Sequence, residues 1–314
     1  MAKTCVFLGE ELAKYGFPGG HPFSSDRHAA YKQALESSGL LDRCCIRSPC
    51  AASLEQLLQF HSKAYVAQVQ HCSASGRGYL DAGDTPAFPG VYRAAATVVG
   101  TTLAAVDAVM NGDCRHAFTP IGGLHHARRN SASGFCVFND CAVAIEHLFS
   151  VYKLDRVLYV DIDAHHGDGV FYSYENDERV VFLDFHQDSR TLYPGTGKAT
   201  ETGTGSAQGT KLNVEMSPGS SDEAFLTQWS RGRDFLDRFA PRFILLQCGV
   251  DSMSGDPITD LQFSHAVHGF VTHELIRYAD LHCEGKLVAM GGGGYSLGNI
   301  SKGWTAVTES MLNA

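Results

Sequence analysis

Short apolar runs that alternate with helical patterns constrain the fold of this chain more than any other feature. Four such runs are residues 156–160, 180–183, 243–247 and 286–290. Runs of this length and composition are typical of strands that are buried on both faces of a sheet. Helical patterns are found at residues 93–110, 139–152 and 222–239. The alternation predicts an α/β fold, with a central, mostly parallel sheet and helices on both faces.

The length and composition indicate one globular domain. Hydrophobic residues make up 44% of the 314 residues and charged residues 19%, unlike the composition of a disordered chain. A length of about 150 residues per domain would suggest two domains, but single α/β domains are often longer. The most linker-like stretch, residues 199–210, is short enough to be a surface loop. We therefore expect residues 1–314 to form a single domain.

Charge and cysteine content narrow the range of partners and environments. Lys and Arg number 25 and Asp and Glu number 34, and the resulting net charge of -9 argues against nucleic acid as a partner. Apolar runs fall short of the 18 residues that a membrane span needs, so we expect no membrane association. The ten cysteines are scattered and include no Cys-x2-Cys pair, which favours reduced thiols in a cytoplasmic protein.

Four clusters of polar residues or glycines each follow a strand-like apolar run. The clusters are residues 122–126, 161–168, 249–251 and 291–295. In open α/β sheets, ligands bind beyond the carboxyl ends of the strands. We therefore expect the four clusters to meet at one edge of the sheet and to form the functional site there.

The cluster at residues 161–168 indicates a metal site. Asp161, Asp163 and His165 alternate, so an extended backbone would project all three to one side. Carboxylates this close are costly unless a cation compensates their charge. Asp163 and His165 can supply two ligands and Asp251 a third, which leaves a position for water as hydrolytic zinc sites do. The same ligands suit iron, cobalt or manganese. The simpler alternative is that this motif only caps a following helix.

The adjacent His125 and His126 are candidates for proton transfer. On an extended segment they would point in different directions, which suggests two roles. Asp161 and Asp168 are spare carboxylates that could hold one ring each and raise its pKa for acid–base work. The alternative is a pair of ordinary loop histidines.

The glycine run at residues 291–294 precedes Tyr295 and is not a phosphate-binding loop, because no Gly-Lys-Ser/Thr follows it. The Tyr295 hydroxyl is a neutral donor that could stabilise an oxyanion near a metal. It could also be a loop tyrosine that only packs on its neighbours. The chain contains no Gly-x-Ser-x-Gly motif, which disfavours a serine hydrolase of the nucleophile-elbow type.

The chain resembles the zinc-dependent histone deacetylase and acetylpolyamine amidohydrolase family, and in particular its bacterial-type members; this family shares its fold with arginase. The matching segments span nearly the whole chain. The most specific are GGLHHARRNSASGFCVFND at 122–140 and VDIDAHHGDGV at 160–170. Further matches are LYPGTG at 192–197, CGVDSMSGDP at 248–257 and GGGGYSLGN at 291–299, with weaker ones at 21–28 and 84–90.

The resemblance implies a role for each matching residue. It implies one zinc ion per chain, held by Asp163, His165 and Asp251, and structural potassium near the same strand, with Asp161, Asp163 and His165 contributing and Asp184 as a further candidate. It also implies a catalytic set: His126 as general base and acid with Asp168, His125 with Asp161 as its electrostatic partner, and Tyr295 polarising the amide carbonyl. The implied substrate-binding residues are Asp84 at the rim, Gly134, Phe135 and Tyr193 along a narrow tunnel, and Ile258 at the entrance. Arg27 would lie behind the metal, near an acetate exit.

Three positions depart from the family's usual residues. Tyr193 replaces a phenylalanine and adds a hydroxyl to one tunnel wall. Leu124 stands where many eukaryotic members have tryptophan, which would widen the pocket floor. Ile258 replaces the acidic residue of one polyamine-specific branch, and this weakens the case for a polyamine substrate.

Together these features predict a hydrolase that removes acetyl or other acyl groups from Nε-acyl-lysine. A first alternative is the same chemistry on an acetylpolyamine or another small acylated amine. A second is a binder of acyl-lysine without activity, and a third is a manganese ureohydrolase of the arginase type with two metals. The acyl-chain preference, the native metal and the oligomeric state stay open at this level.

Overall fold

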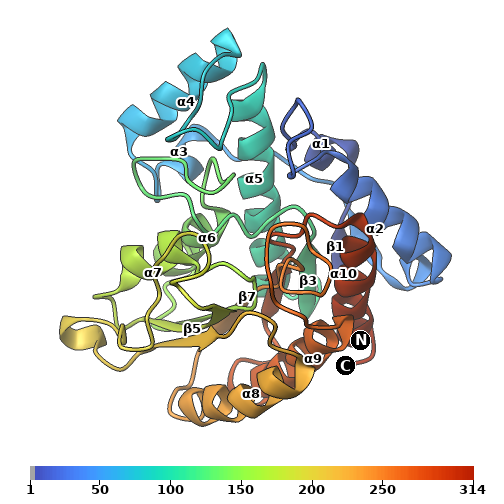
Figure 1. Ribbon diagram of the computed structural model, residues 1–314, viewed down its shortest axis with the longest axis vertical. Helices are drawn as coiled ribbons and strands as arrows, with labels where there is room; N and C mark the ends of the chain where they lie inside the picture. The colour runs from blue at the N-terminus through green and yellow to red at the C-terminus, as the bar shows by residue number, and fades with distance from the viewer. Residues whose placement is uncertain (1–3) are drawn as a thin grey trace.

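The structure is a computed structural model that describes residues 4–314. In this part of the chain, eight strands form one sheet in the order β2-β1-β3-β8-β7-β4-β5-β6, and every neighbouring pair is parallel (Figure 1). The strands are β1 (Cys5–Phe7), β2 (Cys45–Arg47), β3 (His116–Thr119), β4 (Val157–Asp161), β5 (Val180–Gln187), β6 (Lys211–Met216), β7 (Phe243–Gln247) and β8 (Leu287–Met290). The predicted α/β fold with a parallel sheet is confirmed.

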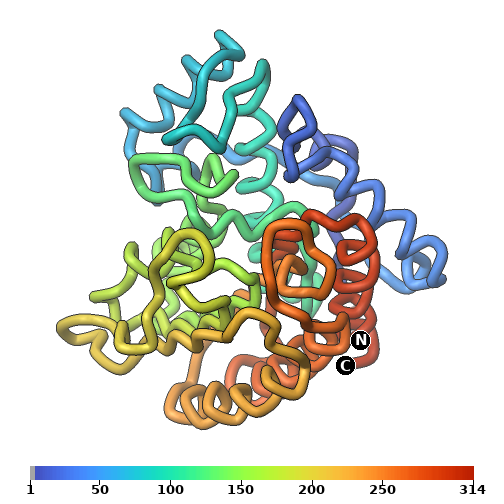
Figure 2. The backbone as a smooth tube through the Cα atoms, in the orientation of Figure 1, coloured from blue at the N-terminus to red at the C-terminus, as the bar shows by residue number. Residues whose placement is uncertain are grey.

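Two groups of helices pack on the sheet, and Figure 1 shows them on its opposite sides. One group is α2 (Asp26–Ser37), α8 (Asp222–Leu236), α9 (His265–His282) and α10 (Leu297–Leu312), in which α10 contacts both α2 and α9. The other is α3 (Leu54–Leu57), α4 (Lys63–Ser75), α5 (Val91–Met110), α6 (Asp140–Ser150) and α7 (Asp168–Tyr174). The short α1 (Glu10–Ala13) contacts α2 and α5. Figure 2 traces the course of the chain through these elements in the same orientation.

Helix α5 is long and apolar enough, by length and composition, to cross a membrane. In this protein, 78% of its most apolar window is buried, and the helix packs against α6 and β3. Burial of this kind is what a core helix of a globular protein shows.

The predicted elements correspond to observed ones with small shifts at their ends. The strand at 243–247 is β7 without change, whereas the strand predicted at 180–183 continues to Gln187. The prediction ended this strand at residue 183 because Asp184 and His186 look like exposed loop residues in the sequence. In the structure both are buried, and His186 Nδ1 lies 2.7 Å from Asp184 Oδ1, so each supplies the polar partner of the other.

The sheet order places the functional clusters together. Strands β3, β8, β7 and β4 are consecutive neighbours and run in one direction, so the residues that follow them emerge side by side at the carboxyl edge. These residues are the four clusters that the sequence analysis identified.

Candidate metal centre and active site

Three side chains from two strand ends converge on one point at the carboxyl edge. Asp163 and His165 follow β4, and Asp251 follows β7; all three are buried. One potential ligand atom from each lies within 4.8 Å of the other two. His165 Nδ1 is 3.0 Å from Asp163 Oδ1 and 3.1 Å from Asp251 Oδ2. Among the described residues, no other group of three His, Cys, Asp or Glu side chains meets this distance limit.

Backbone and amide donors hold the two carboxylates in place. Asp163 Oδ2 accepts a hydrogen bond from Gln247 Nε2 at 2.8 Å and one from the Gly293 backbone N–H at 2.8 Å. Asp251 Oδ1 accepts one from the Ala164 backbone N–H at 2.9 Å. A Cβ atom on Gly249 would lie 2.0 Å from Asp163 Oδ2, so glycine is needed where the backbone approaches the carboxylate.

The electrostatics of this triad favour a bound cation. Burial by itself would lower the pKa of His165, but Asp163 and Asp251 raise it to about 10. Burial and the neighbouring Asp163 raise the pKa of Asp251 to about 7. Two buried carboxylates therefore attract positive charge strongly, and together with the imidazole they form a donor set that suits a divalent ion of the zinc, iron, cobalt or manganese kind.

His125 and His126 lie beside the triad and each has its own carboxylate partner. His125 Nδ1 is 2.8 Å from Asp161 Oδ2, and His126 Nδ1 is 2.7 Å from Asp168 Oδ1. The prediction that the two rings point apart was wrong, because their Nε2 atoms are only 3.1 Å from each other. The segment is not extended: the His125 N–H donates to the Gly123 carbonyl at 2.9 Å in a tight turn.

The two imidazoles have opposite proton affinities. Burial opposes protonation of His125, but the charges of Asp161 and Asp163 raise its pKa to about 9. Burial and the charge on His125 lower the pKa of His126 to about 4. At neutral pH, His125 is therefore charged and His126 neutral, so His126 can accept a proton.

The start of α6 positions the histidine pair. Asn139 caps this helix through the Ala142 N–H, and its Nδ2 donates to the carbonyls of His125 at 3.2 Å and Ala127 at 2.8 Å. The buried Asp140 carboxylate accepts the backbone N–H groups of Gly123 and Leu124. The helix terminus thus fixes the turn that carries the two rings.

One wall of the approach to the site has an unusual backbone. Gly134 and Phe135 have φ angles of 52° and 65°, and a positive φ is uncommon for a phenylalanine. A Cβ atom on Gly134 would lie 2.5 Å from a His126 ring carbon and 3.0 Å from Tyr193. The Tyr193 ring is 5.2 Å from the His126 ring, and its hydroxyl bonds the Ser133 hydroxyl at 2.5 Å. The turn therefore packs closely on both His126 and Tyr193.

Tyr295 completes the inner site. It lines a cavity of about 10 Å³ together with Leu124, both histidines of the pair, Asp163, His165 and Gly134. Burial and the charges of Asp251 and Asp163 keep its pKa well above the ordinary value, so the hydroxyl retains its proton and can donate. Its backbone N–H is held by Asp256 Oδ2 at 2.8 Å.

The remaining predicted residues lie at greater distances from the triad. Asp84 is exposed and lines an open pocket of about 550 Å³ at the mouth, with Asp81, Ser133 and Tyr193. Burial and Asp81 raise the pKa of Asp84 to about 6. Ile258 is half-buried, donates its N–H to Asp256 at 3.1 Å, and lines neither this pocket nor the inner cavity.

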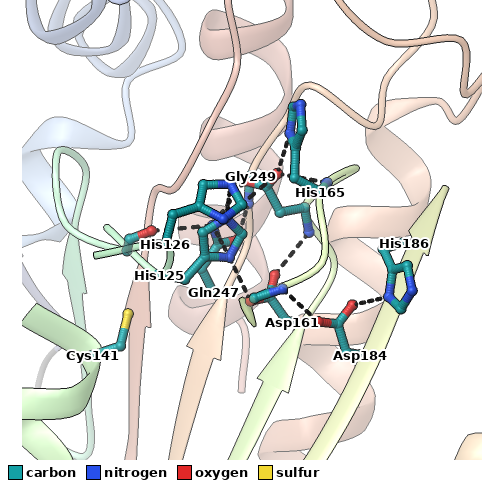
Figure 3. A network of polar contacts seen from close by, with 12 residues as sticks. His125, His126, Cys141, Asp161, His165, Asp184, His186, Gln247 and Gly249 are labelled. Carbon is teal, nitrogen blue, oxygen red and sulfur yellow. Dashed lines mark hydrogen bonds and ion pairs between the residues drawn. The ribbon is translucent and has the colours of Figure 1, made fainter. Parts of the chain in front are cut away.

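Two further predicted residues are buried behind the site. Arg27 is 1% exposed and donates from Nε to the Gly294 carbonyl at 2.9 Å, so it lies beneath the glycine run. Asp184 accepts the Gly167 N–H at 2.9 Å and is the partner of His186 (Figure 3). Asp184 thus already has a buried imidazole as its polar partner.

Three residues of the site were not identified from the sequence. Gln247 holds Asp163, Tyr159 donates its hydroxyl to Asp161 Oδ2 at 2.7 Å, and Arg128 Nη2 donates to Asp168 Oδ2 at 2.9 Å. The polar end of an otherwise apolar strand was an available signal for Gln247, and the i, i+2 spacing to Asp161 was one for Tyr159. The local sequence around Arg128 contains no signal for its contact with Asp168.

Comparison with known proteins gives consistent matches along the chain. The histone deacetylase domain family matches residues 21–311. The acetoin utilization protein AcuC of Bacillus subtilis (strain 168) is 36% identical over 99% of this chain and 82% of its own length. A probable deacetylase of Archaeoglobus fulgidus is 34% identical over 94% of this chain and 82% of its own length. The crystal structure of the HDA15 HD domain superposes with a TM-score of 0.91 at 28% identity, and the match covers 99% of this chain and 88% of that one.

Proposed function

The chain belongs to the histone deacetylase family, and from this premise we propose that it is a zinc-dependent amidohydrolase that removes acyl groups from Nε-acyl-lysine. The observation that carries the proposal is a buried Asp–His–Asp triad beside one small cavity, which two of the triad's residues line together with two carboxylate-paired histidines and a tyrosine. A deacylating hydrolase needs these parts: a site for the ion, a proton carrier and an oxyanion donor.

Asp163, His165 and Asp251 would hold the ion. When bound, a divalent ion supplies Lewis-acid chemistry, which polarises a carbonyl and lowers the pKa of water. Residues 4–314 contain one such ligand group, which favours one ion per chain and disfavours the two-metal arginase alternative. We also propose structural potassium near the metal strand, as the resemblance to the family implies, with Asp161, Asp163 and His165 contributing and Asp184 as a further candidate.

The proton transfers belong to the histidine pair. His126, neutral at neutral pH, accepts the proton of the attacking water at Nε2, because its Nδ1 is held by Asp168. The same nitrogen then protonates the leaving amine. His125 stays charged through Asp161 and stabilises negative charge beside it. No proposed catalytic position lacks its side chain, which disfavours an inactive acyl-lysine binder.

Tyr295 donates its hydroxyl to the oxyanion that forms as water adds to the amide carbon. Gly134, Phe135 and Tyr193 form the walls along which the lysine chain passes, and Asp84 binds the substrate backbone at the mouth. The scattered cysteines favour a cytoplasmic location for this reaction.

The substrate class is tested by comparing kcat/KM for acetyl-lysine peptides and for acetylputrescine. The polyamine alternative draws support from Asp81 and Asp84, which place two carboxyl groups at the mouth and could bind a second amine. We expect the peptides to be preferred by about tenfold or more, which corresponds to about 1.4 kcal/mol. A tenfold preference for acetylputrescine would replace acyl-lysine with the polyamine as the substrate. Turnover of neither compound, with the ion bound, would overturn the amidohydrolase proposal itself.

A further inference from the structure

Both oxygens of the Asp168 carboxylate are in use, and they link His126 to the protein surface. Oδ1 lies 2.7 Å from His126 Nδ1, and Oδ2 accepts a hydrogen bond from Arg128 Nη2 at 2.9 Å. Asp168 is 1% exposed, whereas the side chain of Arg128 is 55% exposed. A buried carboxylate thus has one partner inside the site and one at the mouth.

A hydrogen-bonded turn fixes the backbone at Arg128. The Arg128 N–H donates to the Ser131 carbonyl at 2.9 Å, which closes a tight turn just after the histidine pair. The side chain borders the mouth pocket and a second open pocket that contains Asp168 and Tyr172. The groups that face it are therefore Asp168, Tyr193 and Tyr172, of which Asp168 is the hydrogen-bonded one.

The second hydrogen bond matters because a carboxylate with one partner can rotate. Rotation of Asp168 would move Oδ1 away from His126 Nδ1 and release the ring from the tautomer that keeps Nε2 unprotonated. An exposed ion pair contributes little to stability, but here the acceptor is buried and the bond is charge-assisted. The main effect of the Arg128 hydrogen bond is therefore to orient the Asp168 carboxylate, and its contribution to the stability of the fold is smaller.

We propose that Arg128 is a positioning residue for proton transfer: it locks the Asp168 carboxylate so that His126 presents Nε2 to the reacting water. The proposal rests on the proposed function, in which His126 carries the proton. It does not require Arg128 to touch the substrate.

The test compares Arg128→Met with a matched control, Arg129→Met. Arg129 is the next residue, is 53% exposed and also pairs with a carboxylate, Glu146, at 3.8 Å, but its contacts lead to the Phe60 carbonyl and away from the site. We expect Arg128→Met to lower kcat by about tenfold with little change in KM or metal content, since outer partners of active-site groups are typically worth 10–100-fold. Arg129→Met should keep the wild-type kcat.

A third variant, Arg128→Lys, separates orientation from general structure. Only one nitrogen of Arg128 bonds Asp168, so an ammonium can take its place, and we expect kcat to return to within about threefold of wild type. Equal kcat values for Arg128→Met and Arg129→Met would overturn the role of Arg128 while leaving the proposed function intact. A change in the KM of Arg128→Met without a change in its kcat would do the same. A wild-type protein that turns over no acylated amine would overturn the proposed function.

Discussion

At the scale of single residues, the site shows how neighbouring side chains of one type acquire opposite proton affinities. His125 and His126 are adjacent and equally buried, yet their pKa values are about 9 and about 4. The difference follows from the charges around each ring. The charges of Asp161 and Asp163 offset the burial of His125, whereas for His126 burial and the charge on His125 together lower the pKa in spite of the bond to Asp168.

This difference leads to a prediction for Asp161→Asn. Because Asp161 raises the pKa of His125, the substitution should lower that pKa well below about 9. In the wild type, the folded-state pKa of His125 lies above the ordinary 6.5, so the stabilisation that its protonation contributes disappears as the pH rises from about 6.5 through about 9. NMR titration of the metal-free protein measures the shift, and Asp168→Asn, which acts on His126, is the control. An unchanged His125 titration in Asp161→Asn would contradict the assignment.

Tyr295 gives a second residue-scale prediction. The Tyr295→Phe variant removes one oxygen from the cavity wall and none of the ion's ligands. Loss of one preorganised oxyanion donor typically costs 10²–10³ in kcat, and we expect a loss of that size with unchanged metal content. Steady-state kinetics with elemental analysis provide both values. A variant with nearly full kcat would mean that the hydroxyl does not reach the reacting oxygen.

At the scale of elements, the buried strands were predictable and the short or polar ones were not. Strand β7 is apolar except for Gln247 at its end, and it was predicted to the residue. Strands β1 and β2 have three residues each, too few for a pattern. Strand β6 begins with a buried lysine, Lys211, which sequence patterns place on a surface. These three strands form because they pair with segments that are distant in the sequence.

Lys211 provides a prediction about strand β6. Its Nζ donates to the carbonyls of Asp177 at 3.0 Å and Val180, and to the Thr210 hydroxyl at 2.9 Å, so it ties β6 to the start of β5. In Lys211→Met these acceptors, of which the Val180 carbonyl is buried, lose their donor, at a cost of about 1–3 kcal/mol. Urea denaturation should show that loss, whereas the exposed Lys198→Met should stay within about 0.5 kcal/mol of wild type. Equal stabilities of the two variants would refute this function of Lys211.

At the scale of the whole molecule, the sheet order explains why so much of the site was visible in the sequence. Parallel strands deliver the residues that follow them to one edge, so clusters after strands β3, β4, β7 and β8 could be grouped without coordinates. The contacts that orient the residues of these clusters could not be predicted without coordinates. Gln247 reaches Asp163 across 84 positions of sequence and Arg128 reaches Asp168 across 40, and local patterns contain no information on either pairing.

The central claim is that a single ion, held by Asp163, His165 and Asp251, makes the hydrolysis of an acylated amine possible. Titration of the chelator-stripped protein with Zn²⁺, with deacetylation of an acetyl-lysine peptide as the readout, tests it most directly. The deacetylation rate should start near zero, rise linearly and level off at one equivalent of Zn²⁺ per chain. The rate of the Asp251→Ala variant should not follow this curve. Full activity in the stripped protein, or a plateau reached only at two equivalents, would contradict the claim.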